Sequence, residues 1–420
     1  MKECFGPARI LLPDEEIPVE QWACLACDQF TSQPEYWQRA EAMVREKPSA
    51  LHIVLPEIYL GEPDLPQRIE QIHRAMEEYA EKYLTRQVEG FVYLERDLGG
   101  GCVRQGLVGM VDLEAYDYNP GSSTPIRPTE NTVVERIPPR LAVRRNALLE
   151  SPHVMMLVDD EEHTLIEPLA GQREQMEPLY DFDLMERGGH IAGWKLSDGQ
   201  LGQVAAAMSA LANPDAFHAR YGPDEPVMLF AVGDGNHSLA TAKECYERQK
   251  KLTPPDQWDS LPARYALCEL VNLHDESLEF EPIHRVCFGV DAPKLLKDLA
   301  AAYPGAHYGA GEGHTITYVW AEGEGQITVP TPTAQLEVGT LQEFLDQWLE
   351  RNGGSVDYVH GADVTRQLGA QTGNIGFLLP AMGKDQLFKT VIFDGVLPRK
   401  TFSMGEAHDK RFYLEARKIK

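Results

Sequence analysis

The residue types best suited to chemistry stand together in one short loop, from Gly233 to Ser238. Asp234 can hold a metal ion or accept a proton, and His237 can shuttle one. Glycine at position 235 allows a positive φ and a close approach of a ligand to the backbone. A helix that follows leaves its first N–H groups without internal partners, so its start attracts anions. The sequence therefore predicts an anion-binding loop with two catalytic side chains beside it.

Asn236 and Ser238 complete this loop, and either side chain can cap the helix that follows. In an anion site, both become ligand-binding groups together with Gly235. A plain strand-to-helix turn with an Asx cap explains the same residues without any ligand. The unbroken run of Gly, Asp, Gly, Asn, His and Ser favours the functional interpretation.

A buried strand and an amphipathic helix must position the loop. The six apolar residues 227–232 lie between a proline and a glycine, and such a run suits a strand covered on both faces. After the loop, Leu239, Ala242 and Tyr246 recur at helical spacing with polar residues between them. The pattern predicts strand, loop and helix in that order.

Arginines cluster downstream of a polar loop in a strongly acidic chain. They are Arg127, Arg136, Arg140, Arg144 and Arg145. Pro139 suits the first residue of a helix, on which Arg140 and Arg144 would stack one turn apart. Forked guanidinium groups at this spacing suit a phosphate or a carboxylate, and Glu130 lies in the loop that would line the same site. Local pairing with Glu130, Glu135 and Glu150 is the alternative.

A further carboxylate and two hydroxyls follow a short apolar segment near the N-terminus. Asp28 is a third catalytic candidate, and Thr31 and Ser32 are candidate ligand-binding groups, although turn chemistry alone explains all three. Cys24 and Cys27 form a C-x-x-C motif without a second pair, which indicates thiols flanking a loop rather than a metal site.

His284 and Arg285 form another basic pair. They could bind an anionic ligand, and a packed pair at the edge of a core is the alternative interpretation. The sequence does not identify the ligands of a metal.

The rest of the chain alternates between helical and strand patterns. Helical periodicity covers 34–46, 66–84, 294–303, 341–349 and 362–368, and strand patterns cover 51–55, 90–94, 106–111, 153–158, 266–271 and 389–393. These elements predict a mixed α/β, or α+β, fold. We expect a larger N-terminal part over 1–252, ending in the loop and its helix, and an α+β C-terminal part over 253–420.

Composition narrows the class of protein. The chain has 420 residues and a net charge of −26, with 43% hydrophobic and 25% charged residues, as in ordinary globular proteins. Such a charge repels nucleic acid and anionic membranes, so neither is an expected partner. Because apolar runs stay short, the N-terminus has no signal-peptide pattern and the seven cysteines are scattered, we expect a cytoplasmic protein. The common signatures of serine hydrolases, P-loop enzymes, Rossmann proteins and zincins are missing from the sequence.

Several segments together resemble the domain-of-unknown-function family 1015. The resemblance extends over nearly the whole chain. It rests on residues 28–32, 50–57, 127–130, 178–182, 234–242, 270–272, 284–285 and 397–402. Membership of this family implies no activity.

The loop from Asp234 is also similar, over about ten residues, to the phosphate-binding turn of the ParB/sulfiredoxin-like superfamily. That superfamily includes free-serine kinases, sulfiredoxin and ParB proteins that use CTP. The resemblance implies a ParB/sulfiredoxin-like core with large insertions. Related loops end in arginine, whereas Asn236 and Ser238 here replace the first histidine and that arginine. An arginine from 127–145 would have to substitute for it.

Two functions follow from these observations. The first is a nucleotide-dependent phosphotransferase that acts on a small hydroxyl compound such as an amino acid, with ATP or ADP and Mg²⁺ as cofactors. The second is a protein that binds a nucleotide or phosphorylated metabolite without catalysis. Both predict a small phosphate-containing ligand, and both leave the substrate and the oligomeric state open.

Overall fold

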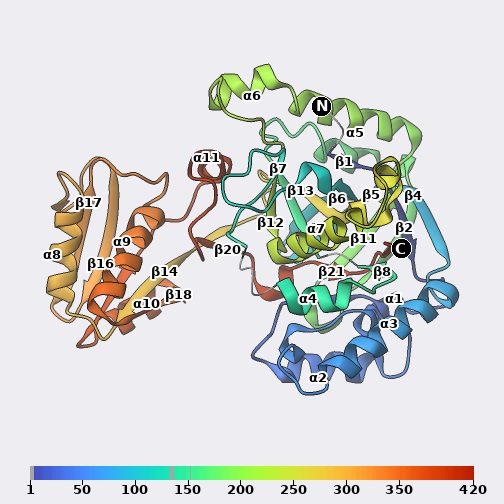
Figure 1. The fold of residues 1–420 in the computed structure, drawn as a ribbon, viewed down its shortest axis with the longest axis horizontal. Helices are drawn as coiled ribbons and strands as arrows, with labels where there is room; N and C mark the ends of the chain where they lie inside the picture. Colours follow the sequence, from blue (N-terminus) through green and yellow to red (C-terminus); the bar gives the residue numbers. More distant parts are fainter. Residues whose placement is uncertain (1–3, 133–136, 152) are drawn as a thin grey trace. The chain divides into compact units, whose positions relative to one another are not determined.

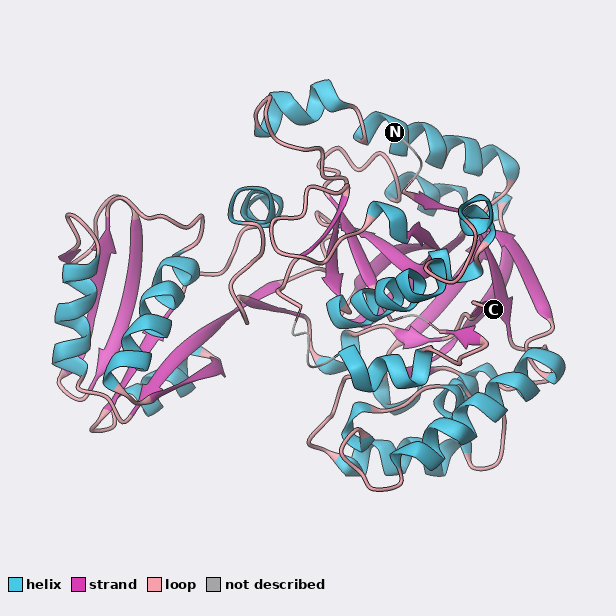
Figure 2. Ribbon diagram, in the orientation of Figure 1, coloured by secondary structure: helices cyan, strands magenta, loops and turns pink. Residues whose placement is uncertain are grey.

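The computed structural model describes residues 4–132, 137–151 and 153–420, which form two compact units. Unit 1 comprises residues 1–278 and 406–420, and unit 2 comprises 279–405. Both units combine helices with β-sheets, as Figures 1 and 2 show. The mixed α+β fold predicted from the sequence is therefore confirmed.

The core of unit 1 is a nine-stranded mixed sheet with the order β10-β11-β5-β6-β13-β9-β12-β7, and β1 pairs with β6. Most neighbours are antiparallel, but β13 is parallel to β9 and β12 is parallel to β7. The strands of this sheet are β1 (Phe5–Gly6), β5 (Val92–Gly99), β6 (Cys102–Asp112), β7 (Ile126–Pro128), β9 (Met155–Val158), β10 (Glu177–Asp183), β11 (His190–Lys195), β12 (Phe230–Asp234) and β13 (Tyr265–Asn272).

Three short two-stranded ladders complete the β-structure of unit 1. They pair β2 (Ala8–Leu12) with β4 (Arg86–Gly90), β3 (Cys24–Leu25) with β21 (Phe412–Tyr413), and β8 (Leu149–Glu150) with β22 (Arg417–Lys418). Two of these ladders tie the C-terminal segment 406–420 to the N-terminal half of the chain.

The helices of unit 1 belong to two main cores. Trp22, Trp37 and Met76 join α1, α2 and α3 to one core, and Leu239 and Tyr246 of α7 pack into the other. The helices are α1 (Val19–Trp22), α2 (Pro34–Val44), α3 (Leu65–Lys82), α4 (Ile137–Arg144), α5 (Asp198–Leu211), α6 (Pro214–Tyr221) and α7 (Asn236–Lys250).

The strand, loop and helix predicted around residue 235 are present as β12 and α7. Phe230, Ala231 and Val232 are fully buried in β12, as the continuous apolar run predicted. Leu239, Ala242 and Tyr246 are buried on the inner face of α7. Figure 1 shows α7 beside α4, where Ile137 and Leu141 pack against Ala240 and Cys245.

Unit 2 contains a seven-stranded sheet with the order β15-β17-β16-β19-β14-β18, to which β20 adds by pairing with β14. Its strands are β14 (Phe280–Phe288), β15 (His307–Tyr308), β16 (His314–Trp320), β17 (Gly323–Val329), β18 (Ser355–His360), β19 (Asn374–Leu378) and β20 (Phe402–Met404). Its helices are α8 (Ala292–Ala302), α9 (Glu337–Asn352), α10 (Ala362–Gly369) and α11 (Lys384–Asp394).

The structure divides the chain differently from the expected boundary after residue 252. Strand β13 lies within the large sheet of unit 1, between β6 and β9, and residues 406–420 return to the same unit. Unit 2 is thus inserted near the end of unit 1. Hydrophobic patterning does not reveal this, because a strand of either unit has the same apolar pattern.

Two predicted strands are helical. Residues 51–55 were expected to form a strand, but Ser49 caps a 3₁₀ helix (η1, Ala50–Ile53) by accepting a hydrogen bond from Leu51 N. Residues 389–393 belong to α11, where Leu387, Phe388 and Val391 recur at helical spacing and are buried. Both apolar runs were too short for their period to be decisive.

Candidate functional site

The first turn of α7 is built around a glycine that no other residue replaces without strain. Gly235 has φ +80°, and a Cβ atom there would lie 3.1 Å from Val154 Cα. The first intrahelical hydrogen bond runs from Leu239 N to Gly235 O at 3.0 Å. The amides of residues 236–238 precede it and so have no partner inside the helix. Gly235 therefore lets the start of α7 lie directly against the backbone of Val154 and the ring of His153.

Asp234 closes one side of this turn. Its Oδ1 accepts a hydrogen bond from Gly235 N at 3.0 Å, and its Oδ2 lies 3.3 Å from Nζ of Lys410. Both side chains are largely covered, with 22% and 13% of their area exposed. A carboxylate and an ammonium group thus stand together beside the helix start.

Asn236 stabilises the fold rather than capping α7 or facing a ligand. It is buried, its Oδ1 accepts from Thr129 N at 3.2 Å, and its Nδ2 donates to Thr129 Oγ1 at 3.1 Å. The same amide reaches Val232 O at 3.3 Å. Among the described residues, no side chain caps α7. The Asx cap expected here is therefore wrong, because this side chain is used to join β7 to the end of β12.

His153 connects the helix start to Asp28. Its Nε2 lies 3.1 Å from Ser238 Oγ and 3.8 Å from Asp28 Oδ2. The imidazole side chain is only 6% exposed, and Asp28 is 26% exposed. Asp28 and Ser238, both predicted from the sequence, thus meet through a histidine that was not.

On its other side, His153 contacts the C-terminal segment. Its Nδ1 lies 2.5 Å from the hydroxyl of Tyr413, and this hydroxyl donates to Cys27 Sγ at 2.9 Å. Cys27 N donates back to the Tyr413 oxygen at 3.3 Å. Because Tyr413 uses its only proton toward Cys27, its oxygen accepts from the Nδ1–H of His153.

The charges around His153 keep its ring protonated. Burial is the largest influence and lowers the pKa, but Asp28, Cys27 and Asp234 outweigh it and raise the pKa of His153 to about 9. Burial alone would raise the pKa of Asp28, yet His153 and the hydrogen bond from Gln29 bring that pKa below its ordinary value. An imidazolium therefore faces an ionised carboxylate at neutral pH.

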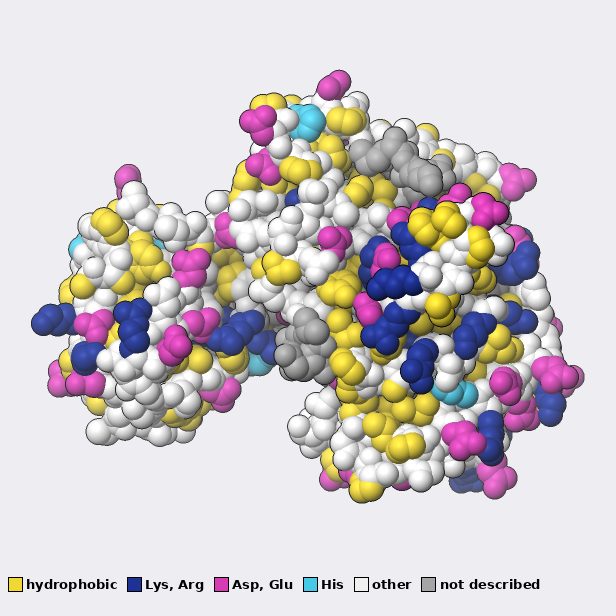
Figure 3. Space-filling view, in the orientation of Figure 1, with side chains coloured by type: hydrophobic (Ala, Val, Ile, Leu, Met, Phe, Trp, Pro, Cys, Tyr) yellow, Lys and Arg dark blue, Asp and Glu magenta, His cyan; other side chains and the backbone are white. Residues whose placement is uncertain are grey.

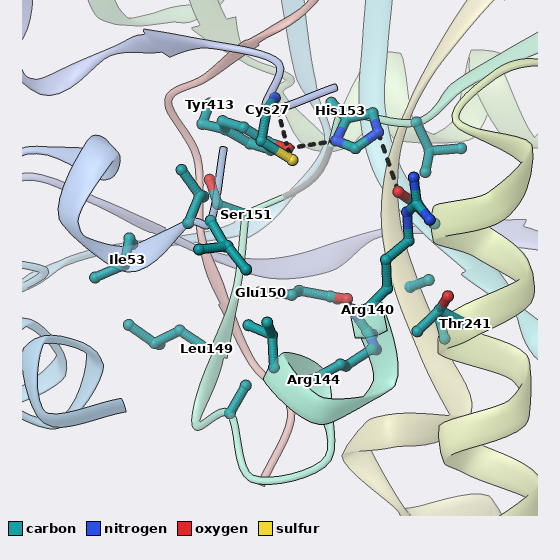
Figure 4. Close-up of a pocket in the computed structure, with 18 of the residues that line it drawn as sticks. Cys27, Ile53, Arg140, Arg144, Leu149, Glu150, Ser151, His153, Thr241 and Tyr413 are labelled. Carbon is teal, nitrogen blue, oxygen red and sulfur yellow. Dashed lines mark hydrogen bonds and ion pairs between the residues drawn. The ribbon is translucent and has the colours of Figure 1, made fainter. Parts of the chain in front are cut away.

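A cavity of about 160 Å³ opens beside this cluster within unit 1. Figure 4 shows Cys27, His153 and Tyr413 at one end of the cavity, with Arg140 and Thr241 along one side and Ile53 and Leu149 across from them. Ser151 and Ser238 also line the cavity. Polar groups thus interrupt a largely apolar lining at several places, with Arg144 away from the end formed by Cys27, His153 and Tyr413.

The two arginines expected to stack on one helix both line this cavity. Arg140 and Arg144 lie on α4, with 16% and 18% of their side-chain area exposed. Arg140 forms an ion pair with Glu57, and Arg144 Nη2 lies 2.5 Å from Glu150 Oε2. Local pairing with Glu150 was the alternative interpretation. In the structure, Arg144 does pair with Glu150, and it also lines the cavity.

Other predicted site residues lie apart from the cavity lining. Arg127 is buried and donates to the carbonyl oxygens of Thr124 and Pro226, at 3.0 Å and 2.6 Å, so it stabilises the 124–127 turn instead. Thr31 and Ser32 are exposed, and Glu130 is half-buried after β7. Arg136 lies outside the described residues.

His237 lies on the first turn of α7, half-buried, and its carbonyl accepts from Thr241 Oγ1 at 2.7 Å. Its side chain does not line the cavity. The histidine that does so is His153, which precedes β9 by two residues. Position next to a buried strand is the one sequence signal that could have indicated it.

His284 and Arg285 belong to unit 2 and stabilise it. His284 Nδ1 accepts from Leu379 N at 3.1 Å. The fully buried Arg285 donates to Gln342 Oε1 at 3.0 Å and to three backbone carbonyl oxygens, those of Ile283, Lys400 and Arg399. The core-edge alternative therefore describes this pair, and the predicted ligand-binding role has no support from its contacts.

Lysine and arginine side chains also gather on the outer face of unit 1, over α7 (Figure 3). Two basic side chains of α7 itself are paired within the helix: Lys243 Nζ is 2.9 Å from Glu247 Oε1, and Arg248 Nε is 2.7 Å from Glu244 Oε1.

Comparison with known proteins identifies the family. Residues 7–348 match the family described as "Protein of unknown function (DUF1015)". The chain belongs to this family. The match extends over most of unit 1 and into unit 2 of this DUF1015 protein. No curated protein matches the sequence.

Several solved structures are similar to this DUF1015 protein. Free serine kinase in complex with AMP is 10% identical, with a TM-score of 0.38 and coverage of 74% of this chain and 91% of that chain. A conserved hypothetical protein from Pyrococcus furiosus is 11% identical, with a TM-score of 0.35 and coverage of 74% and 94%. SbnI with a C-terminal truncation, from Staphylococcus aureus, is 10% identical, with a TM-score of 0.35 and coverage of 73% and 85%. The predicted ParB/sulfiredoxin-like core stays a prediction. Within the described part of this chain, every helix is too short or too polar to cross a bilayer.

Proposed function

We propose that unit 1 binds a nucleotide and transfers a phosphoryl group between it and a small hydroxyl compound. The observation that carries this proposal is the charge arrangement at the first turn of α7. Two cations, His153 and Lys410, and two carboxylates, Asp28 and Asp234, converge there from four separate segments. Phosphoryl transfer requires mainly positioning and neutralisation of charge, which such groups supply.

The phosphates would lie against the start of α7. Helix N-termini favour anions through their amides and dipole. The ammonium of Lys410 and the imidazolium of His153 add positive charge beside these amides. Their present carboxylate partners would be displaced in part by the more highly charged phosphates. In this proposal, these two cations take the place of the arginine that ends related loops, where this chain has Ser238.

Asp28 is the candidate group for positioning the attacking hydroxyl. Its carboxylate is ionised, since its pKa lies below the ordinary value. The imidazolium of His153, 3.8 Å from this carboxylate, is already protonated, so it stabilises negative charge and does not take up the proton of the hydroxyl. Asp28 therefore accepts a proton in this proposal, and His153 stabilises charge.

A magnesium ion would enter with the nucleotide rather than occupy a prepared protein site. Among the described residues, the group of acids and histidine with ligand atoms close enough to share an ion is Asp159, Glu161 and His274. Arg220 already forms ion pairs with the two acids of that group, at 2.9 Å and 2.7 Å. Magnesium commonly uses one or two carboxylates plus substrate phosphates, and Asp28 or Asp234 fits that role.

The second candidate function is binding without catalysis. One observation favours it: each charged group around the site already has an opposite partner. Arg140 pairs with Glu57, Arg144 with Glu150 and Lys410 with Asp234. A site whose charges are already paired can bind a ligand, but it stabilises a transition state little more than it stabilises the bound ligand.

The test combines binding with product analysis. Calorimetric titration with AMP, ADP and ATP, with and without Mg²⁺, measures affinity, and ³¹P NMR with a panel of hydroxyl metabolites detects transfer. His153→Gln removes the charge but keeps hydrogen-bonding groups. We expect it to weaken nucleotide binding about ten- to hundredfold, the size of a charged hydrogen bond. His218→Gln, on α6 and away from the cavity lining, is the matched control.

The outcomes separate the two candidates. Turnover that Asp28→Asn reduces about a hundredfold or more, with nucleotide affinity little changed, supports transfer. Nucleotide binding without product under all conditions supports the non-catalytic function. Equal nucleotide affinity in the wild type, His153→Gln and His218→Gln would exclude the site at the start of α7.

A further inference from the structure

The cavity next to α7 has walls of two different kinds. Apolar side chains form most of it, among them Ile53, Met76, Leu149 and Leu267. These four residues are all buried in the structure, at 4% exposure or less. An apolar lining of this kind favours an apolar body in the ligand, because it offers no hydrogen bonds to water.

The volume limits the ligand to a small molecule. At about 160 Å³, the cavity is close in size to an engineered protein cavity of about 150 Å³ that binds benzene. One ring or one short branched chain fills such a space. A nucleotide does not fit within it, so a nucleotide and the occupant of this cavity would be different molecules.

The charged groups of the lining leave a surplus positive charge at one point. Arg140 pairs with Glu57 and His153 with Asp28, so these two cations are balanced. At Glu150, by contrast, two arginines, Arg144 and Arg417, face one carboxylate.

Glu150 is moreover shared. Its Oε1 accepts from Arg417 Nε at 2.7 Å and from Leu267 N at 3.0 Å, in addition to the contact of its Oε2 with Arg144. The guanidinium of Arg144 has five N–H donors, and Glu150 engages it through Nη2. Donors on Arg144 are thus available for a forked contact with a ligand carboxylate.

We propose that this cavity binds a small monocarboxylate with a compact apolar body, its carboxylate held by Arg144 and its apolar part against Ile53, Leu149 and Leu267. The binding itself does not depend on phosphoryl transfer. Its interpretation as the acceptor substrate, a hydroxy acid or related compound with an apolar side chain, rests on the proposed function.

Cysteine protection tests the location. Cys27 lines the cavity and is half-buried, and Cys102 is equally half-buried but lies outside the lining. The full chain is treated with iodoacetamide with and without benzoate, and alkylation of both cysteines is measured by peptide mass spectrometry. We expect saturating benzoate to slow alkylation of Cys27 about tenfold or more and to leave Cys102 unchanged. Equal rates at Cys27 with and without benzoate would overturn the proposal.

A comparison of isosteric probes tests the ligand class. Benzamide has the shape of benzoate without its charge, and acetate has the charge without the apolar body. We expect calorimetric affinities for both to be about tenfold weaker or more than for benzoate. Benzamide loses a charge-assisted contact, and acetate loses the burial of the ring, and each loss is worth at least that factor. Benzamide binding as tightly as benzoate would refute the carboxylate assignment, and acetate binding as tightly would refute the apolar one.

The role of Arg144 has a matched pair of variants. Arg144→Met keeps the volume of the side chain and leaves Glu150 bonded to Arg417, so the variant should fold. The substitution should abolish the preference for benzoate over benzamide. Arg145→Met changes the neighbouring arginine, which is exposed and outside the lining, and should keep the preference. An unchanged preference in Arg144→Met contradicts the proposal. These assays contain no nucleotide. Benzoate can therefore bind as expected even if the nucleotide titrations show no binding, and a nucleotide can bind even if benzoate does not.

Discussion

Replacing Arg411 by methionine should destabilise unit 1 more than any loss of a surface charge. Arg411 is buried between two acids: one arm forms an ion pair with Glu269, and Nη2 lies 2.5 Å from Glu415 Oε2. All three side chains are at most 3% exposed. Arg411→Met fills similar space but leaves two buried carboxylates short of a cation.

The surroundings set the magnitude. Glu269 keeps Arg104, whose Nε is 3.5 Å from its Oε1, and Glu415 keeps the hydroxyl of Tyr180 at 2.6 Å. Removing one partner of a buried ion pair costs about 3–5 kcal/mol. A loss of this size lowers the melting temperature by on the order of 10 °C for a unit this large.

The pH dependence gives a sharper signature. Burial is the largest influence on Glu269 and raises its pKa, but Arg104 and Arg411 bring that pKa below the ordinary value. In the wild type, the stability from this ionised group is present above the ordinary pKa and is lost as pH falls through the lowered one. Without Arg411, the pKa rises, so the native state of the variant takes up a proton more readily and gains stability as pH falls. The deficit should therefore shrink between pH 8 and pH 5.

The assay is urea unfolding followed by circular dichroism at pH 5, 6.5 and 8. The control is Arg9→Met, whose ion pair with Glu89 is about two-thirds exposed on both sides (69% and 67%) and should cost at most about 1 kcal/mol. If Arg411→Met is as stable as Arg9→Met at pH 8, or if its deficit grows toward pH 5, then the buried network does not stabilise the fold as argued.

Three further predictions concern single features of the two units. Gly235→Ala should destabilise unit 1 by about 1–2 kcal/mol in urea unfolding, because the φ of Gly235 is left-handed. The control, Gly199→Ala in α5, has room for a methyl group and should be neutral or stabilising. Equal effects of the two substitutions would contradict this prediction. An NMR titration should show His153 protonated until the pH nears 9, with a lower midpoint in the Asp28→Asn variant. The contribution of the charged His153 to stability is complete below pH 6.5 and is lost as the pH rises through about 9. A titration midpoint near 6.5 in both proteins would refute the charge argument. Arg285→Met should destabilise unit 2 in urea unfolding by about 1–3 kcal/mol for each buried acceptor that it leaves without a donor. A variant as stable as the wild type would contradict the structural role assigned to Arg285.

The structure also corrects the interpretation of the anion-binding loop. Gly235 takes the positive φ expected of it, and Asp234 and Ser238 face polar partners beside the helix start. Asn236 instead turns inward to Thr129, because a buried strand edge needed a donor and an acceptor there. Side-chain direction at a loop depends on neighbours distant in sequence, so residue type alone could not settle it.

Local patterns in the sequence determined the elements that position the site. The apolar run before Gly233 and the spacing of Leu239, Ala242 and Tyr246 sufficed for β12 and α7, because burial on a strand or helix face imposes a fixed period. The spacing of Arg140 and Arg144 likewise sufficed to place two cations on one face of a helix, although α4 begins at Ile137, two residues before the start predicted at Pro139.

The tertiary structure alone decided which residues meet. Cys27, His153 and Tyr413 are separated by more than a hundred residues each, yet they form one hydrogen-bonded chain at the cavity. Tyr413 and Lys410 arrive there because the last segment pairs β21 with β3 after the whole of unit 2 has intervened. Pairing between distant short strands leaves almost no periodic signal, since two residues are too few to show a period, so the sequence could not reveal the half of the site that the C-terminus supplies.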